Sequence, residues 1–321
     1  HIGFVFLLAA FLICEVKTGI MSFDALSVYF ANNNNTALFF LFFAGFAMKA
    51  GFLPFHTWLP EAHPTAPSHV SGVMSGVMLK MGIYGILRVI MYLKSDMYEI
   101  GIILVVISSI SGLYGIILST IQKDIKKILA YSSIENIGII GIGIGIGLIG
   151  LGLNNNALIL LGFAGSLLHV LNHSLFKSLL FFAAGSVYKQ YKTRDINKLG
   201  GVVKKMPVTS VLFLVGAVAV CGLPPLNGFI SEVIIFSGLF KGLSIGGFNL
   251  SILMIFVIVA LALIGGIAVF SFTRFFGIAF LGNQRSEEII EVNENSFSGL
   301  MPQILIAFLI LLIGLMPLLF V

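Results

Sequence analysis

The chain has 321 residues, of which 58% are hydrophobic and only 10% carry a formal charge. Soluble domains carry about 25% charged residues, so this composition excludes an ordinary soluble globular domain. The net charge of +5 is confined largely to a few loops, which argues against a nucleic-acid-binding protein. The two cysteines, Cys14 and Cys221, lie far apart in apolar surroundings and predict neither a disulfide framework nor a metal site.

Apolar blocks long enough to cross a bilayer recur along the whole chain, so we predict a polytopic helical membrane protein. The first apolar run is short and no methionine precedes it, so we expect the chain to be truncated at its N-terminus and to open inside a helix. It is not expected to be a signal peptide, since it lacks a basic flank and a cleavage site. A short amphipathic segment, 22–30, is expected at the membrane interface. The nine expected membrane segments are 1–14, 36–54, 68–93, 98–121, 125–152, 155–188, 207–240, 250–276 and 298–320.

Two of these segments are expected to be interrupted by proline, at Pro54 and at Pro224-Pro225. Lys49 precedes the first break, and Glu232 follows the second. Broken helices in transporters expose unpaired backbone groups and helix-end dipoles at mid-membrane, where they form a polar pocket. The mirrored order of charge and break predicts an inverted internal repeat.

Lysine and arginine gather in two of the expected loops, 122–127 and 189–205. The positive-inside rule therefore predicts that both loops are cytoplasmic. Two spans separate these loops, so the two assignments agree with each other. Arg88 and Lys94, near another loop, count against this orientation but are outnumbered.

The stretch GIGIGIGLIGLG, residues 141–152, contains Gly145, Gly147 and Gly150 in the spacing of a dinucleotide-binding motif. That motif requires a strand followed by a helix, and no such unit is expected here. Small residues instead predict that this helix packs closely against its neighbours.

Seven ionisable side chains fall inside the expected spans. Each buried charge costs at least about 2.5–3.5 kcal/mol, so we predict that the set is functional. The candidate proton-relay residues are Lys49, Lys80, Glu135, His169, His173, Lys177 and Glu232.

Three of these side chains, His169, His173 and Lys177, recur at intervals of four, which places them on one face of a helix. Histidine exchanges protons near neutral pH, so this stripe favours a proton relay. Two histidines four residues apart can also bind zinc, but no carboxylate or cysteine accompanies them here. A packing role for either histidine alone remains open.

Other candidates also have structural alternatives. Lys49 and Lys80 could each form an ion pair with a neighbouring helix, and Glu135 is near enough to the start of its span to lie at the interface. Solvated or capping roles are expected for a group of polar residues that follows the first break, with use as a proton entrance as the alternative. This group is His56, Glu61, His63 and His69.

Several stretches resemble one family in their order and spacing. They are KAGFLPFHTWLPEAHPTAPSHVSGVMSGVMLKMGIYGILR, QKDIKKILAYSSIENIGIIG, LLHVLNHSLFKSLLFFAAGSVY, LPPLNGFISE and FFGIAFLGNQRSEE. The chain resembles the antiporter-like, proton-translocating membrane subunits shared by respiratory complex I and multisubunit sodium/proton antiporters. It is most similar to the large membrane subunit, of the component B type, of hydrogenase-4 and formate hydrogenlyase complexes. The resemblance covers essentially the whole chain.

The resemblance implies an all-α polytopic membrane protein with two interrupted helices, organised as one antiporter-like domain over 1–321. Its first repeat, 1–93, would be incomplete, its second would cover about 98–276, and 298–320 would be an extra helix. A glutamate that pairs with the first lysine would lie upstream of this chain, so the fragment alone should not pump.

Residue roles also follow from the resemblance. It assigns Lys49 to the lysine of the first broken helix and Lys80 to the lysine of the next helix. The stripe at 169–177 matches the central polar axis of the family, and Glu232 matches the terminal residue through which protons leave.

No flavin, iron–sulfur or nickel motif is present in the sequence, so we expect no cofactor and no redox chemistry of the chain itself. The resemblance implies other membrane subunits and a peripheral redox arm of the nickel–iron hydrogenase type as partners, in the cytoplasmic membrane of a bacterium or archaeon. The expected function is proton translocation within a redox-driven complex. Two alternatives are a subunit of a sodium/proton antiporter, and a scaffold whose charges only pair and fix helices.

Overall fold

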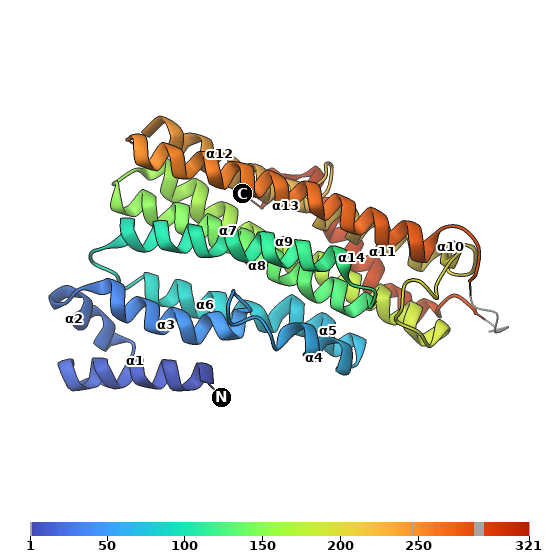
Figure 1. Ribbon diagram of the computed structural model, residues 1–321, viewed down its shortest axis with the longest axis horizontal. Coiled ribbons are helices and arrows are strands. Elements are labelled where there is room, and N and C mark those ends of the chain that lie inside the picture. Colours follow the sequence, from blue (N-terminus) through green and yellow to red (C-terminus); the bar gives the residue numbers. More distant parts are fainter. Residues whose placement is uncertain (1, 246, 286–291, 321) are drawn as a thin grey trace.

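The computed structural model describes residues 2–245, 247–285 and 292–320, and these residues form a helical bundle without a β-strand (Figure 1). In chain order the elements are α1 (Ile2–Thr18), α2 (Asp24–Asn32), α3 (Asn35–Ala50), α4 (Leu59–Thr65), α5 (Ser68–Val73), the π-helical turn η1 (Met74–Met78), α6 (Leu79–Ile90), α7 (Met97–Ile121), α8 (Ile125–Gly152), α9 (Asn156–Tyr191), α10 (Val202–Lys205), α11 (Pro207–Val220), α12 (Asn227–Ile245), α13 (Phe248–Phe280), α14 (Phe297–Leu315) and the 3-10 turn η2 (Pro317–Leu319).

Seven stretches of the described chain are long and apolar enough to cross a membrane. They are Ser68–Ile90, which joins α5, η1 and α6, together with α7, α8, α9, α12, α13 and α14. Each predicted membrane segment corresponds to one helix or to consecutive helices, and α2 occupies the predicted interfacial segment. Residue 1 of the first predicted segment lies outside the described residues. The prediction of an all-α polytopic fold is confirmed.

Both predicted interruptions are present. After α3 ends at Ala50, the chain passes through 51–58 before α4 begins, and α11 and α12 are separated by 221–226. In Figure 1 the two helices of each pair lie toward opposite ends of the bundle, so each pair forms one interrupted crossing. Gly51, with a φ of 88°, provides the left-handed conformation that ends α3. The peptide bonds Leu53-Pro54 and Pro224-Pro225 are cis.

A third irregularity, the turn η1, was not predicted from the sequence. A π-helical turn inserts an extra residue into a helix and changes the partners of its carbonyl groups. The carbonyl oxygen of Ser75 accepts a hydrogen bond from Lys80 Nζ, and that of Gly76 accepts one from Ser174 Oγ on α9. The turn therefore places polar backbone groups in the middle of the crossing.

The glycine-rich helix α8 lies between α7 and α9 and is almost entirely buried. A β-carbon at Gly138 would lie 2.6 Å from both Gly112 N and Ser108 O on α7. On its other side, Gly143 lies close to α9, where a β-carbon would approach Gly162 O to 3.0 Å. The glycines therefore allow backbone-to-backbone packing on both faces, as predicted from the GIGIGIGLIGLG stretch.

The two basic loops meet at the same end of the bundle, as the charge pattern predicted. Ile125 N donates to Arg194 O at 2.9 Å, and Ile196 N donates to Lys123 O at 3.0 Å. Lys94 belongs to a different loop, which contacts the start of α3 through Asn35.

Asp124 fastens these loops by capping α8. Its carboxylate accepts from the backbone N–H groups of Lys126 and Lys127 at 2.8 and 3.2 Å, and it pairs with Arg194 Nε at 3.1 Å. Loss of a helix N-cap costs about 1 kcal/mol. We expect Asp124→Ala to lower the melting temperature of the purified protein by a few degrees, measured in detergent.

Asp124→Asn separates the two contributions of this side chain. Asparagine still caps a helix but cannot form the ion pair, so its loss of stability should be the smaller one. Equal losses in the two variants would contradict the capping role.

Candidate functional site

Lys80 and His173 form a direct contact inside the bundle. Lys80 lies in the first turn of α6, directly after η1, and its Nζ is 2.6 Å from His173 Nδ1 on α9. Lys80 is 9% exposed and His173 is fully buried. His173 Nε2 has no hydrogen-bond partner among the described residues. The pair can therefore pass a proton between two nitrogen atoms and has a second ring nitrogen available for a water molecule.

His169, one turn earlier on α9, links α8 to α12. Its Nε2 is 3.1 Å from Asn136 Oδ1, and its Nδ1 is 2.9 Å from Ser231 Oγ. Asn136 Nδ2 donates to Ser132 O, so its oxygen faces the histidine and accepts the Nε2 proton. The remaining nitrogen, Nδ1, is then the atom that can receive a proton from Ser231. We call Lys80, His173, His169 and Ser231 the buried polar line.

Two asparagines hydrogen-bond to each other and connect the buried polar line to the helix that follows the second break. Asn172 Nδ2 donates to Asn227 O at 2.7 Å and to Ser231 Oγ at 2.9 Å, and Asn227 Nδ2 donates back to Asn172 Oδ1 at 3.1 Å. Asn227 is the first residue of α12. Asn172, Asn227 and Ser231 are not among the site residues predicted from the sequence. The positions of Asn172 between two histidines and of Asn227 just after Pro225 were the available signals.

Lys177 lies one turn beyond His173 and is fully buried. Its Nζ donates to Leu129 O at 3.1 Å and lies 5.9 Å from the centre of the Phe272 ring. The same carbonyl accepts from Ser133 Oγ, which is 2.8 Å from Ser75 Oγ on η1. These bonds connect Lys177 to the π-helical turn that also holds Lys80.

The two carboxylates occupy different surroundings. Glu135 is 1% exposed, so it is buried inside the bundle, and it accepts from Ser132 Oγ at 2.8 Å. Glu232 is half-buried on α12 and covers the turn at Gly222, where a β-carbon would lie 2.5 Å from its Oε2. No ion pair within 4.0 Å joins either carboxylate to a cation in the described part of the chain.

Lys49 does not join the other candidates. Its side chain is exposed and lines a cavity of about 1030 Å³, mostly apolar, formed with residues of α1 and α6 such as Phe4 and Tyr84. Lys80, rather than Lys49, is the lysine that contacts the histidine stripe.

The polar residues after the first break divide into two groups. Glu61 and His69 are exposed, and Glu61 pairs with Lys127 at 2.7 Å, as expected for solvated groups. The expectation was wrong for His56 and His63, which are buried. His63 stacks on Phe181 at a centroid distance of 4.6 Å, and neither of its nitrogens has a partner among the described residues.

The sequence is similar to membrane subunits of known complexes. Residues 1–258 match the family described as NADH:quinone oxidoreductase/Mrp antiporter, TM. Hydrogenase-4 component B of Escherichia coli (strain K12) is 40% identical over 98% of this chain and 48% of its own length. Formate hydrogenlyase subunit 3 of the same organism is 42% identical over 76% of this chain and 40% of its own length. The chain thus spans less than half the length of these relatives.

Two solved structures share the fold. The Mrp complex from Dietzia sp. DQ12-45-1b contains a chain that superposes with a TM-score of 0.84 at 19% identity, over 99% of this chain and 64% of that chain. The membrane-bound sulfane sulfur reductase, an archaeal respiratory membrane complex, gives a TM-score of 0.82 at 27% identity, over 97% and 50%. The family match covers most of the chain, and the helices and their two breaks agree with it. The chain therefore belongs to the NADH:quinone oxidoreductase/Mrp antiporter transmembrane family.

Proposed function

We propose that the chain translocates protons as part of a redox-driven membrane complex. The observation that carries this proposal is the buried polar line, in which Lys80 contacts His173 and His169 contacts both α8 and α12. Buried ionisable groups are costly in a membrane protein and mark ion pathways and proton relays. Lys80 and His173 are in hydrogen-bond contact, as are His169 and Ser231, and one helical turn of α9 separates the two pairs. Such a line of groups, on several helices, supports transport more than isolated packing roles.

The line supplies proton carriers at short intervals. Lys80 can give a proton to His173, whose free Nε2 can pass one onward through a bound water. His169 and Ser231 continue the line to the start of α12, where Glu232 follows Ser231 in the sequence. Glu135 and Lys177 are buried near the line but are not part of it. They change the electrostatic environment of the line when they gain or lose protons.

The energy for transport must come from a partner. The similarity to a hydrogenase-4 component and to a formate hydrogenlyase subunit supports a peripheral arm of the hydrogenase type. We also propose that the membrane is the cytoplasmic membrane of a prokaryote, with the basic loops at its inner face, because basic loops are retained on that side.

Glu232→Gln in the complete complex tests this function. Glutamine keeps the size of the side chain but cannot bind and release a proton. In vesicles containing the complex, we expect proton uptake to fall by at least about a hundredfold, as is common when a proton-transfer group is lost. A pH-sensitive dye inside the vesicles measures the uptake.

Glu99→Gln is the matched control, since Glu99 is exposed in the first turn of α7. It should pump at the unmodified rate. If Glu232→Gln also pumps normally and only assembly suffers, the chain is a scaffold. If uptake requires a sodium gradient rather than redox turnover, the chain serves an antiporter.

A further inference from the structure

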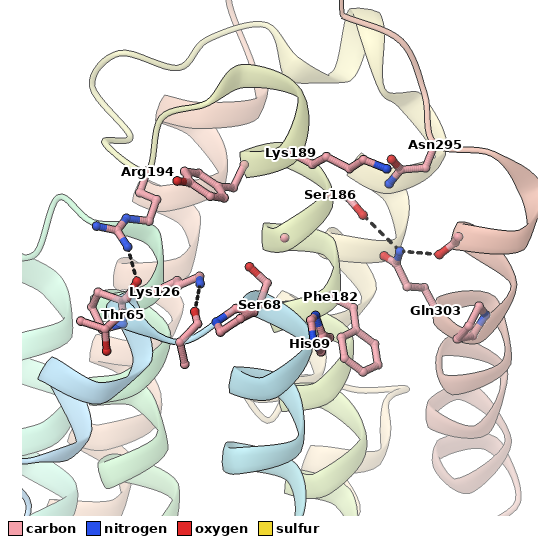
Figure 2. A pocket seen from close by; sticks show the side chains of 17 residues that line it. Thr65, Ser68, His69, Lys126, Phe182, Ser186, Lys189, Arg194, Asn295 and Gln303 are labelled. Atoms are coloured by element: carbon pink, nitrogen blue, oxygen red, sulfur yellow. Dashed lines mark hydrogen bonds between the residues drawn. The ribbon is translucent and has the colours of Figure 1, made fainter.

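A cavity of about 730 Å³ with basic side chains in its lining lies outside the buried polar line, where α5 begins, α9 ends and α14 begins. Residues Phe182, Gly185 and Ser186 of α9 line it between the other two helices (Figure 2). It lies in the last turns of α9, at the end of the bundle that carries the basic loops. Its lining on α9 runs from Phe182 to Lys189, seven residues further on, so the cavity extends about 10 Å along the helix axis.

The charge of the cavity is strongly one-sided. Lys126, Lys189 and Arg194 supply its positive charge, His69 also lines it, and its described lining contains no aspartate or glutamate. Asp124, just outside, pairs with Arg194 Nε and leaves the other cations without a carboxylate within 4.0 Å among the described residues. The cavity therefore suits an anion.

Two of the cations are held in fixed positions. Lys126 Nζ donates to Ala66 O at 2.6 Å, and Arg194 Nη1 donates to Pro64 O. Each lies 5.9 Å from the ring centre of Tyr188. Because Ala66 O and Pro64 O are neutral, the charge of Lys126 is not paired with a carboxylate, whereas Arg194 is paired with Asp124. Both side chains keep further N–H groups that can donate to a ligand. Lys189 reaches toward Asn295 across the cavity (Figure 2).

Gln303 restricts which anions fit the cavity, because its amide oxygen needs a hydrogen-bond donor. Its Nε2 donates to Ser186 Oγ and to Gly299 O, at 3.2 and 3.1 Å, which orients the amide. Its Oε1 has no partner among the described residues, although the residue is only 3% exposed. An occupant that carries a hydroxyl group as well as an anion would satisfy this oxygen.

We propose that this cavity binds the headgroup of an anionic phospholipid with free hydroxyl groups, of the phosphatidylglycerol class. Its phosphodiester would face the cations, and a glycerol hydroxyl would donate to Gln303 Oε1. A lipid fits better than a soluble anion because exposed apolar side chains continue along both flanking helices. Val70 and Val73 lie on α5, and Met301 and Leu305 lie on α14. Basic pockets between transmembrane helices at the cytoplasmic side are established sites for lipid headgroups in other proteins.

Native mass spectrometry of the delipidated complete complex tests this site. Phosphatidylglycerol is titrated against phosphatidylcholine with the same acyl chains, and glycerol phosphate serves as the soluble probe. We expect phosphatidylglycerol to bind at least about tenfold more tightly than phosphatidylcholine, because each cation near an anionic headgroup contributes about fivefold. Glycerol phosphate should not displace it.

Substitutions locate the binding. Lys126→Gln and Lys189→Gln together should weaken phosphatidylglycerol binding about 25-fold. Lys189 is exposed, so Lys189→Glu is expected to fold normally and to weaken binding further than Lys189→Gln. Lys198→Gln is the matched control, since it removes an exposed cation of the same basic loop outside the cavity, and it should change binding by less than about twofold.

Three results would overturn the proposal. They are equal binding of the two phospholipids, displacement by glycerol phosphate, and unchanged binding in the Lys126 and Lys189 variants. The readout is lipid occupancy, so these results are independent of whether the complex pumps protons.

Discussion

Replacing Lys80 with methionine is expected to reduce coupled proton movement by about a hundredfold or more, as for other lost proton-transfer groups. The Lys80 ammonium is the group that joins η1 to the histidine stripe, through Ser75 O and His173 Nδ1. Methionine fills a similar volume without a titratable nitrogen. Proton uptake by vesicles containing the complete complex measures the effect, and Lys94→Met, an exposed loop lysine, is the control.

Lys80→Arg distinguishes a relay from a structural contact. Arginine keeps the positive charge and can still donate hydrogen bonds, but it does not release its proton at physiological pH. A relay therefore fails in this variant as it fails with methionine. Recovery of proton uptake by arginine would show that the position needs only a charge, and the relay would be refuted.

The second large effect is expected for Gly138→Leu. A side chain at this position would meet the backbone of α7 at 2.6 Å, at Gly112 N and Ser108 O, and backbone atoms cannot rotate away. Overpacking a core costs about 1–3 kcal/mol when side chains can adjust, and we expect a larger cost here. The amount of folded protein recovered from membranes should fall severely, as measured by immunoblot and by size-exclusion chromatography in detergent.

Gly265→Leu is the control for this substitution, because a β-carbon at Gly265 on α13 would meet no atom within 4 Å. It should accumulate normally. Gly138→Ala should give an intermediate yield. Normal accumulation of Gly138→Leu would contradict the close packing of α7 and α8.

The crossings could be predicted because long apolar runs and prolines are local features of the sequence. The buried charges stood out for the same reason, and Lys80, His169 and His173 are indeed buried. The outward direction of Lys49 could not be predicted, since hydropathy indicates membrane depth but not which face of a helix meets protein. Such a distinction depends on the packing of α1, α3 and α6.

Neutral polar residues of the site could not be recognised in the sequence as the buried charges could. Asn172 and Ser231 carry no charge, so they are less unusual in an apolar helix than a lysine is, and their role emerges only from the hydrogen bonds between α9 and α12. The turn η1 contains no proline and resembles any apolar helical stretch. Its geometry depends on contacts with α9, such as the bond from Ser174 to Gly76.

The direction of the buried polar line has a consequence for how the transmembrane voltage acts on it. The line passes from α6 to α12, but along α9 it advances only from His169 to His173, four residues or about 6 Å. In a hydrocarbon layer about 30 Å thick, about one fifth of the transmembrane voltage falls across this distance. A proton moving between these rings would then gain or lose only about 0.5 kcal/mol per 100 mV. The membrane potential therefore acts mainly on the steps that connect the line to the two aqueous phases, while lateral transfer is governed by local charge.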